Sequence, residues 1–143
     1  MPLHVTQLDS VLLMMAELYS QGVGPFDPAR ARRAMEQLLA EPEFGGVWII
    51  RAEGQTAGYL VLVLGYSLEF GGRFGLLDEL FVGERWRGMG LGGQALRFAA
   101  GLCRARQWNA LRLEVARGNS RAAALYAAAG FASHNRDLMT WWM

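Results

Sequence analysis

A glycine-rich segment is the part of this sequence whose residue types and spacing suggest chemistry most directly. It reads Arg87-Gly88-Met89-Gly90-Leu91-Gly92-Gly93 and lies between a predicted strand and a predicted helix. Amides at the start of a helix have no partner within it, and the helix dipole is positive there, so such a turn can bind an anion. Glycines let the backbone approach a phosphate, and the Arg87 guanidinium can donate to phosphate oxygens. We therefore predict a phosphate-binding turn.

Two other interpretations of this segment have to be weighed. Gly88, Gly90 and Gly93 also match the spacing of a dinucleotide-binding motif, and Glu114 follows about 20 residues later. Against this, a bulky charged stretch, Glu84-Arg85-Trp86-Arg87, separates the strand from the first glycine, and the preceding sheet reads as antiparallel. A chain of 143 residues also cannot hold two nucleotide-binding halves. The remaining alternative is a purely structural glycine turn.

The elements that must position this turn are predicted from hydrophobic periodicity and turn residues. Together they predict one α/β domain over residues 1–143, with a three-stranded meander joined first by a turn at 53–55. We expect helices over 11–19, 28–41, 91–102 and 120–129, and strands over 47–50, 59–66, 74–82, 111–115 and 137–142.

Composition excludes several chemistries. The chain has 14 basic and 13 acidic side chains, so no large field of one sign favours nucleic acid or an anionic membrane. It contains no lysine, which rules out a P-loop lysine and a Schiff base. The lone Cys103 reads as helix packing, because His4 and His134 offer no pattern that would activate a thiol. We predict no metal site.

Two motifs give the chain a resemblance to the GCN5-related N-acetyltransferase (GNAT) superfamily. That family's signature, Gln/Arg-x-x-Gly-x-Gly/Ala at a strand-to-helix turn, is similar to Arg87–Gly92. Its terminal helix pattern, Asn-x-x-Ala-x-x-Leu-Tyr-x-x-x-Gly-Phe, is matched in order by Asn119, Ala122, Leu125, Tyr126, Gly130 and Phe131. With the strand 77–82, the resemblance covers roughly residues 47 to 131.

The resemblance implies a fold and a cofactor. The family's mixed sheet splays open in the middle, here between 74–82 and 111–115, and is flanked by helices. The pantetheine arm of acetyl-CoA would enter from one side and the acceptor from the other. The segment Arg87–Gly93 would cradle the pyrophosphate, and Asn119 would contact the cofactor or only cap its helix. The strand end Leu80, Phe81 and Val82 would pair with pantetheine amides, with an amide near Val82 holding the oxyanion. The family's first strand could only be 3–5, and very short.

Transfer to an amine needs a proton acceptor, because an alkylamine is protonated at neutral pH. Asp78 and Glu79 are adjacent carboxylates, and neighbours on a strand point to opposite faces, so only one can face a given cleft. The resemblance favours Asp78, whereas Glu79 has the longer reach and would share a face with Leu77 and Phe81. Either carboxylate can also be merely solvated or ion-paired, with water chains taking the proton.

The departing thiolate needs a proton, and the resemblance assigns this role to Tyr126 as general acid. The alternative for Tyr126 is an aromatic core residue on an alanine-rich helix. Glu114, on the partner strand, is more readily explained as structural.

The acceptor is expected to be a small cationic amine such as a polyamine, amino acid or amino sugar. Around the early helices and the meander, Glu43, Glu69 and the carboxylate pair outnumber the bases Arg51 and Arg73. Alternatives are a protein N-terminus or lysine, or a non-catalytic acetyl-CoA sensor.

The sequence also suggests the cellular location and the binding partners of the protein. Trp141 and Trp142 could pair sheets in a homodimer or line the chain's own pocket. No signal peptide or 18-residue apolar stretch is found, so we expect a cytoplasmic protein with no membrane or nucleic-acid partner.

Overall fold

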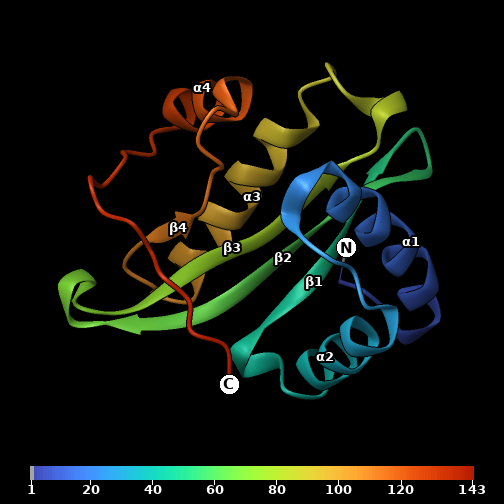
Figure 1. The fold of residues 1–143 in the computed structure, drawn as a ribbon, viewed down its shortest axis with the longest axis horizontal. Coiled ribbons are helices and arrows are strands. Elements are labelled where there is room, and N and C mark those ends of the chain that lie inside the picture. The colour runs from blue at the N-terminus through green and yellow to red at the C-terminus, as the bar shows by residue number, and fades with distance from the viewer. Residues whose placement is uncertain (1) are drawn as a thin grey trace.

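The computed structural model describes residues 2–143, in which one four-stranded mixed sheet has helices on both faces (Figure 1). This is the α/β architecture predicted from the sequence. The elements follow in the order α1 (Leu8–Leu18), α2 (Pro28–Ala40), β1 (Gly45–Ala52), β2 (Gln55–Ser67), β3 (Gly72–Val82), α3 (Leu91–Ala105), β4 (Leu111–Leu113) and α4 (Ser120–Ala129).

The strands lie in the order β1-β2-β3-β4, with antiparallel pairing for the first two neighbours and parallel pairing between β3 and β4. The β1–β2 turn is built on Glu53 and Gly54, whose φ angles of 51° and 74° give it the twist that a hairpin needs. The crossover from β3 to β4 runs through α3, so the glycine-rich segment sits at the start of that crossover helix.

Both faces of the sheet are apolar, which explains why β1 and β2 read as nearly continuous hydrophobic runs. On one face, Val47, Tyr59 and Val61 pack under α1 and α2. On the other, Leu60 and Leu62 pack against α3, together with other alternate strand residues. We call these the α1 face and the α3 face. No helix in residues 2–143 has the length and apolar character needed to cross a membrane.

A β-bulge in β3 breaks the alternation on which the sequence prediction relied. Val61 pairs with Glu79, but its neighbour Leu62 pairs with Leu77, so Asp78 is an extra residue in the ladder. Leu77 therefore packs on the α3 face, whereas Phe81 packs on the α1 face. The prediction that Glu79 shares a face with both was wrong for Leu77, because the bulge reverses the pleat between them.

The sheet opens between β3 and β4, as predicted. The two strands pair only over Gly75–Leu77 and Leu111–Leu113, and beyond those residues the described chain shows no pairing between them. β4 ends at Leu113 rather than the predicted Val115, because a strand without a neighbour has no ladder to extend it. The second half of β3 thus has an open edge.

The ends of the chain differ most from the prediction. The short first strand is reduced to a bridge between Pro2 and Trp48, with the Leu3 amide donating to the Val47 carbonyl at 2.9 Å. The final strand over 137–142 was wrong, because the tail after Phe131 contains no strand. Ion pairs hold this tail instead of ladder hydrogen bonds, from Arg117 to Asp137 and from Arg136 to Glu69. Figure 1 shows it crossing in front of β3 and β2 toward α2.

Candidate active site

The glycine-rich segment forms the turn from β3 into α3. A short 3-10 turn, Glu84–Trp86, leaves β3 and buries the Trp86 side chain against Leu91, so both ends of the turn are anchored in the core. Gly88 and Gly90 have φ angles of 78° and 79°, in the left-handed region that glycine tolerates best. The sequence therefore needs glycine at these two positions to enter α3 at this angle.

The amides of this turn are free to receive a ligand. Gly90 is the N-cap of α3 without a side-chain cap, and across residues 2–143 no amide from Gly88 to Gly93 donates a hydrogen bond. A Cβ added at Gly88 or Gly90 would meet no atom within 4 Å. Uncapped amides at the positive end of a 15-residue helix, with open space before them, fit a phosphate or pyrophosphate.

Arg87 links the turn to the end of β3. Its Nε donates to the Val82 carbonyl at 3.0 Å, and its guanidinium lies 6.0 Å from the centre of the Phe81 ring. The terminal amino groups form no other hydrogen bond in the described chain, so they remain available to an anion. Met89, at the tip of the turn, is exposed.

The open edge of β3 presents backbone groups toward the splay. Gly83 donates to the Ala57 carbonyl at 2.8 Å, while Val82 pairs with Gly58, so the Val82 pair is one without mutual hydrogen bonds. The amide and carbonyl of Leu80 and the amide of Val82 therefore point away from β2, into the opening, whereas the Val82 carbonyl accepts from Arg87 Nε. An extended ligand with its own amides could pair there as a strand does.

Glu79 is held by two tyrosines from other elements. The Tyr19 hydroxyl donates to its Oε2 and the Tyr59 hydroxyl to its Oε1, both at 2.7 Å. Burial raises the pKa of Glu79, and the two hydrogen bonds counter part of that rise by favouring the ionised form. Asp78 adds a further rise, so the two carboxylates are close enough to interact.

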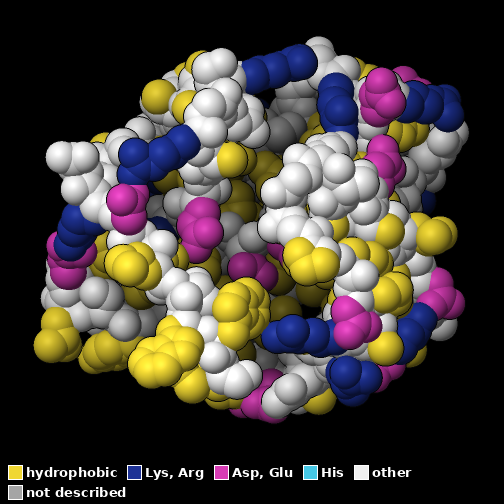
Figure 2. All heavy atoms as spheres, viewed as in Figure 1, with side chains coloured by type: hydrophobic (Ala, Val, Ile, Leu, Met, Phe, Trp, Pro, Cys, Tyr) yellow, Lys and Arg dark blue, Asp and Glu magenta, His cyan; other side chains and the backbone are white. Residues whose placement is uncertain are grey.

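Asp78 has different surroundings. Its side chain is exposed at the bulge and, in residues 2–143, makes no hydrogen bond or ion pair. Its pKa is nevertheless raised, first by the desolvation caused by surrounding atoms and then by the Glu114 carboxylate, which follows β4 across the opening. Figure 2 shows acidic side chains in a hollow near the middle of the face that it draws. The two carboxylates are thus close enough to interact, but only Glu79 accepts hydrogen bonds from other side chains in residues 2–143.

Tyr126 lies on α4 and is half-buried among the side chains of the α3 face. Its ring packs edge-on against Phe131, with centroids 6.0 Å apart, and burial raises the pKa of its hydroxyl. That hydroxyl forms no hydrogen bond within the described chain. Leu125, beside it on α4, is the nearest neighbour of an added Cβ on Gly92, so α4 lines the glycine-rich turn. Tyr126 and Glu79 belong to opposite faces, and only something that passes through the splay could touch both.

Asn119, Tyr19 and Tyr59 also differ in how far their roles could be predicted from the sequence. The Asn119 Oδ1 accepts from the Ala122 amide at 3.2 Å, so Asn119 caps α4. Tyr19 and Tyr59 were missed, since the contact between residues 19, 59 and 79 depends on strand register and on the packing of α1. The one available signal was a tyrosine within an otherwise apolar strand, where its hydroxyl needs a partner.

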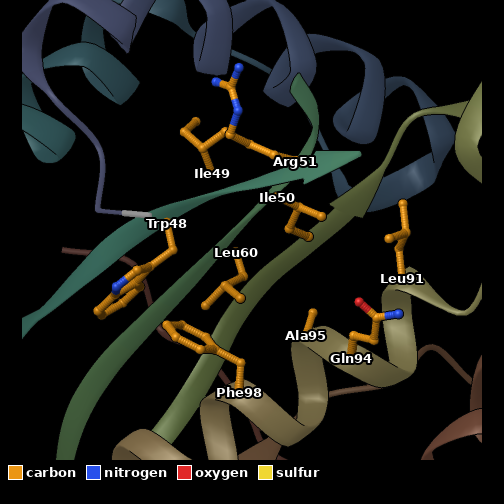
Figure 3. Close-up of a pocket in the computed structure, with 9 residues that line it drawn as sticks. All are labelled: Trp48, Ile49, Ile50, Arg51, Leu60, Leu91, Gln94, Ala95 and Phe98. Carbon is orange, nitrogen blue, oxygen red and sulfur yellow. The ribbon is translucent and has the colours of Figure 1, made fainter. Parts of the chain in front are cut away.

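A second hollow lies elsewhere, between α3 and strands β1 and β2. It encloses about 220 Å³, and Figure 3 shows Trp48, Leu60 and Phe98 pointing into it. Its lining includes Gln94 and Arg51 but no carboxylate, thiol or imidazole. The two candidate proton acceptors, Asp78 and Glu79, lie on β3 beside the splay, so we place the candidate active site there and not in this cavity.

Comparison with known proteins agrees with this architecture. The model of the acetyltransferase (GNAT) family matches residues 12–131, and the chain belongs to that family. None of the curated protein sequences matches the chain.

Solved structures share the fold along nearly the whole chain. An integron cassette protein from the mobile metagenome of Cole Harbour Salt Marsh is 31% identical, with a TM-score of 0.86 over 99% of this chain and 88% of its own. An aminoglycoside 6′-N-acetyltransferase from Acinetobacter haemolyticus is 17% identical, with a TM-score of 0.81 over 100% and 97%. A ribosomal-protein-alanine N-acetyltransferase from Brucella melitensis biovar Abortus 2308 is 21% identical, with a TM-score of 0.78 over 99% and 96%. At the last two identities, the likeness concerns the fold alone.

Proposed function

We propose that this protein uses acetyl-CoA to acetylate a primary amine on a small cationic molecule, such as a polyamine, amino acid or amino sugar, by direct attack in a ternary complex. The observation that carries the proposal is the junction of three features at the splay. These are an uncapped glycine-rich turn, an open strand edge and carboxylates without a basic partner.

The chain's residues fit acetyl-CoA in two places. The amides of Gly88–Gly93 and the Arg87 guanidinium would bind the pyrophosphate, since they offer donors and positive potential with open space before them. The amide and carbonyl of Leu80 would pair with the amides of the pantetheine arm. When bound, acetyl-CoA supplies the activated acetyl thioester.

Asp78 is the better candidate for the proton acceptor. In residues 2–143 its carboxylate accepts no hydrogen bond, and desolvation and Glu114 both raise its pKa, which makes it a stronger base than an ordinary aspartate. Glu79 already accepts hydrogen bonds on both oxygens, and these stabilise its ionised form. Of the two candidates weighed from the sequence, the contacts favour Asp78.

Tyr126 would return a proton to the departing sulfur. Its raised pKa keeps the hydroxyl protonated at neutral pH, and no acceptor in the described chain engages it. The Val82 amide, which points into the opening, would stabilise negative charge on the acetyl oxygen.

The acceptor preference rests on charge. In residues 2–143, none of Asp78, Glu79 and Glu114 forms an ion pair, although the chain carries 14 basic residues. Glu114 helps to raise the pKa of Asp78, and Asp78 helps to raise the pKa of Glu79, so these carboxylates without a counter-ion form a negative region that attracts a cation.

Calorimetric titration of the purified protein with acetyl-CoA, and separately with NAD, tests the first step. We expect binding of acetyl-CoA alone, followed by turnover of some members of a panel of small amines. Binding of NAD alone, or of neither, would contradict the proposal. Turnover of peptides but of no small amine would transfer the acceptor assignment to a protein substrate.

A further inference from the structure

The Glu79 carboxylate is oriented by contacts from three separate elements. Glu79 belongs to β3, Tyr59 to β2, and Tyr19 begins the π-helical turn Tyr19–Val23 that follows α1. Each hydroxyl donates to a different carboxylate oxygen at 2.7 Å. Because both oxygens are held, the plane of the carboxylate is fixed and one lone pair on each oxygen remains unused.

The two tyrosines act as donors only. Burial raises the pKa of both phenols and the neighbouring Glu79 raises them further, so both stay neutral at physiological pH. Tyr59 is completely buried in the core of the α1 face, where a phenol without a partner would lose free energy. The two hydrogen bonds favour the ionised form of Glu79 against the rise in its pKa that burial causes, and no arginine in residues 2–143 pairs with its carboxylate.

The groups that face Glu79 leave only a cation from outside to balance it. From α1 and β2 it faces neutral phenols, and on its own strand its neighbour is Asp78, which is itself acidic and interacts with Glu114. A half-buried carboxylate whose two oxygens both accept hydrogen bonds from phenols is held in one orientation, so it can contact a cation at a defined position. Its role in an amine acetyltransferase is then recognition of a positive charge that the acceptor keeps.

We propose that Glu79, oriented by Tyr19 and Tyr59, binds a second cationic group of the acceptor while Asp78 takes the proton from the amine that is acetylated. The acceptor class is thereby narrowed to diamines and polyamines. This inference rests on the proposed acetyltransferase function. Glu79 is a specificity-determining residue in this scheme, and the two tyrosines are positioning residues.

Tyr19 connects the Glu79 carboxylate to the turn between α1 and α2. Gly22 and Gly24 in this segment have φ angles of 104° and 143°, and a Cβ added at either would meet no atom within 4 Å. The Tyr19 ring is held on the other side by Phe26, with ring centroids 5.2 Å apart. The turn between α1 and α2 therefore contributes one of the two hydrogen bonds that orient Glu79.

A nuclear magnetic resonance titration tests the orientation without any substrate. The carboxyl carbon of Glu79 is followed against pH in the wild type, Tyr19→Phe and Tyr59→Phe, with Tyr66→Phe as the control because Tyr66 is exposed on the same strand as Tyr59. Loss of either hydroxyl should raise the pKa of Glu79, and the control should leave it unchanged. An unchanged pKa in Tyr19→Phe would show that Tyr19 does not orient the carboxylate.

Kinetics with putrescine and n-butylamine, which have the same chain length, test the recognition. The wild type should prefer putrescine at least tenfold in kcat/KM, and Glu79→Gln should remove most of that preference. Tyr19→Phe should raise KM for putrescine about fivefold with little change in kcat, as expected for weakening one contact to a charged group. Equal use of both amines by the wild type would overturn the inference, whereas failure to bind acetyl-CoA would overturn the proposed function itself.

Discussion

Asp78 and Glu79 are neighbours in the sequence but have different chemical surroundings. Asp78 is an exposed bulge residue that accepts no hydrogen bond in the described part of the chain, whereas Glu79 accepts hydrogen bonds from two phenols. The sequence was enough to propose these two acids as candidate proton acceptors, because their residue types and their place on the strand before the glycine-rich turn are visible locally. It could not predict the bulge or the tyrosine contacts, because both depend on how β2 and α1 meet β3.

Asp78→Asn separates catalysis from stability. We expect kcat to fall about a hundredfold, since a general base contributes on that order, and the acidic limb of the pH profile attributed to this carboxylate to disappear. Glu17→Gln, which removes an exposed carboxylate from α1, serves as the control. An unchanged pH profile would move the role to Glu79 or to water.

The same variant should be slightly more stable at neutral pH. The folded-state pKa of Asp78 is raised above the ordinary value of 3.8, so its contribution to stability is present below that value and is lost as pH rises through the folded pKa. Asparagine cannot ionise and avoids this loss. Thermal unfolding should show a Tm about 1–2 °C above the wild type at pH 7 and no difference near pH 3, a modest gain because the side chain is exposed. A lower Tm at pH 7 would mean that the charge is stabilised by contacts absent here.

Tyr126→Phe tests the general acid. The ring keeps its packing against Phe131 and loses only the hydroxyl, so stability and acetyl-CoA affinity should be unchanged within about twofold, while kcat falls roughly tenfold to hundredfold. Calorimetry and steady-state kinetics measure the two quantities. A variant with the wild-type kcat would show that Tyr126 has a packing role only.

At the level of elements, the glycine-rich turn and α3 act as one unit. The sequence predicted this turn, and its bounds for α2, α3 and α4 agree closely with the structure, because caps, breakers and periodicity are local signals. The predicted helix over 120–129 is α4, which begins after its Asn119 cap and ends at Gly130. The π-helical turn after α1 was missed, since no local pattern distinguishes it from a fraying helix end.

Two glycine substitutions in this unit should have opposite effects. Gly90→Ala places a side chain at a φ of 79° and should cost about 1 kcal/mol of unfolding free energy. Gly101→Ala lies inside α3 with nothing within 4 Å and should stabilise the protein by about 0.5–1 kcal/mol. Urea denaturation measures both, and calorimetry should show weaker acetyl-CoA binding for Gly90→Ala alone. Equal affinities would argue that the ligand does not approach Gly90.

At the scale of the whole molecule, the two ends of the chain are attached in different ways. The N-terminal segment is part of the core, since Leu3 is only 6% exposed and its amide bonds to β1. The C-terminal tail lies on the surface, with its last apolar side chains exposed and the Arg30 guanidinium 5.5 Å from the centre of the Trp142 ring. The predicted last strand failed because alternation can indicate a strand only if a neighbour is there to pair with it.

Truncation after Asp137 should therefore change the free energy of unfolding by less than about 1 kcal/mol, because little apolar surface is buried there. Leu3→Ala, the comparison at the other end, should cost about 2–3 kcal/mol through loss of buried contacts. Thermal unfolding of both variants measures these two losses of stability. A truncation that destabilises more than Leu3→Ala would show that the tail packs more tightly than its exposure indicates.

The bulge at Asp78 also has a genetic consequence. Because Leu77 and Glu79 pair with adjacent residues of β2, Asp78 is an insertion that the ladder does not use. An in-frame loss of that single codon would leave every other pair of the two strands in register, with the same side chains on the same faces. The β2–β3 pair would persist without its bulge, but the proposed base would be lost. Gain or loss of the proposed base at this position would therefore require the insertion or deletion of one residue and no change of fold.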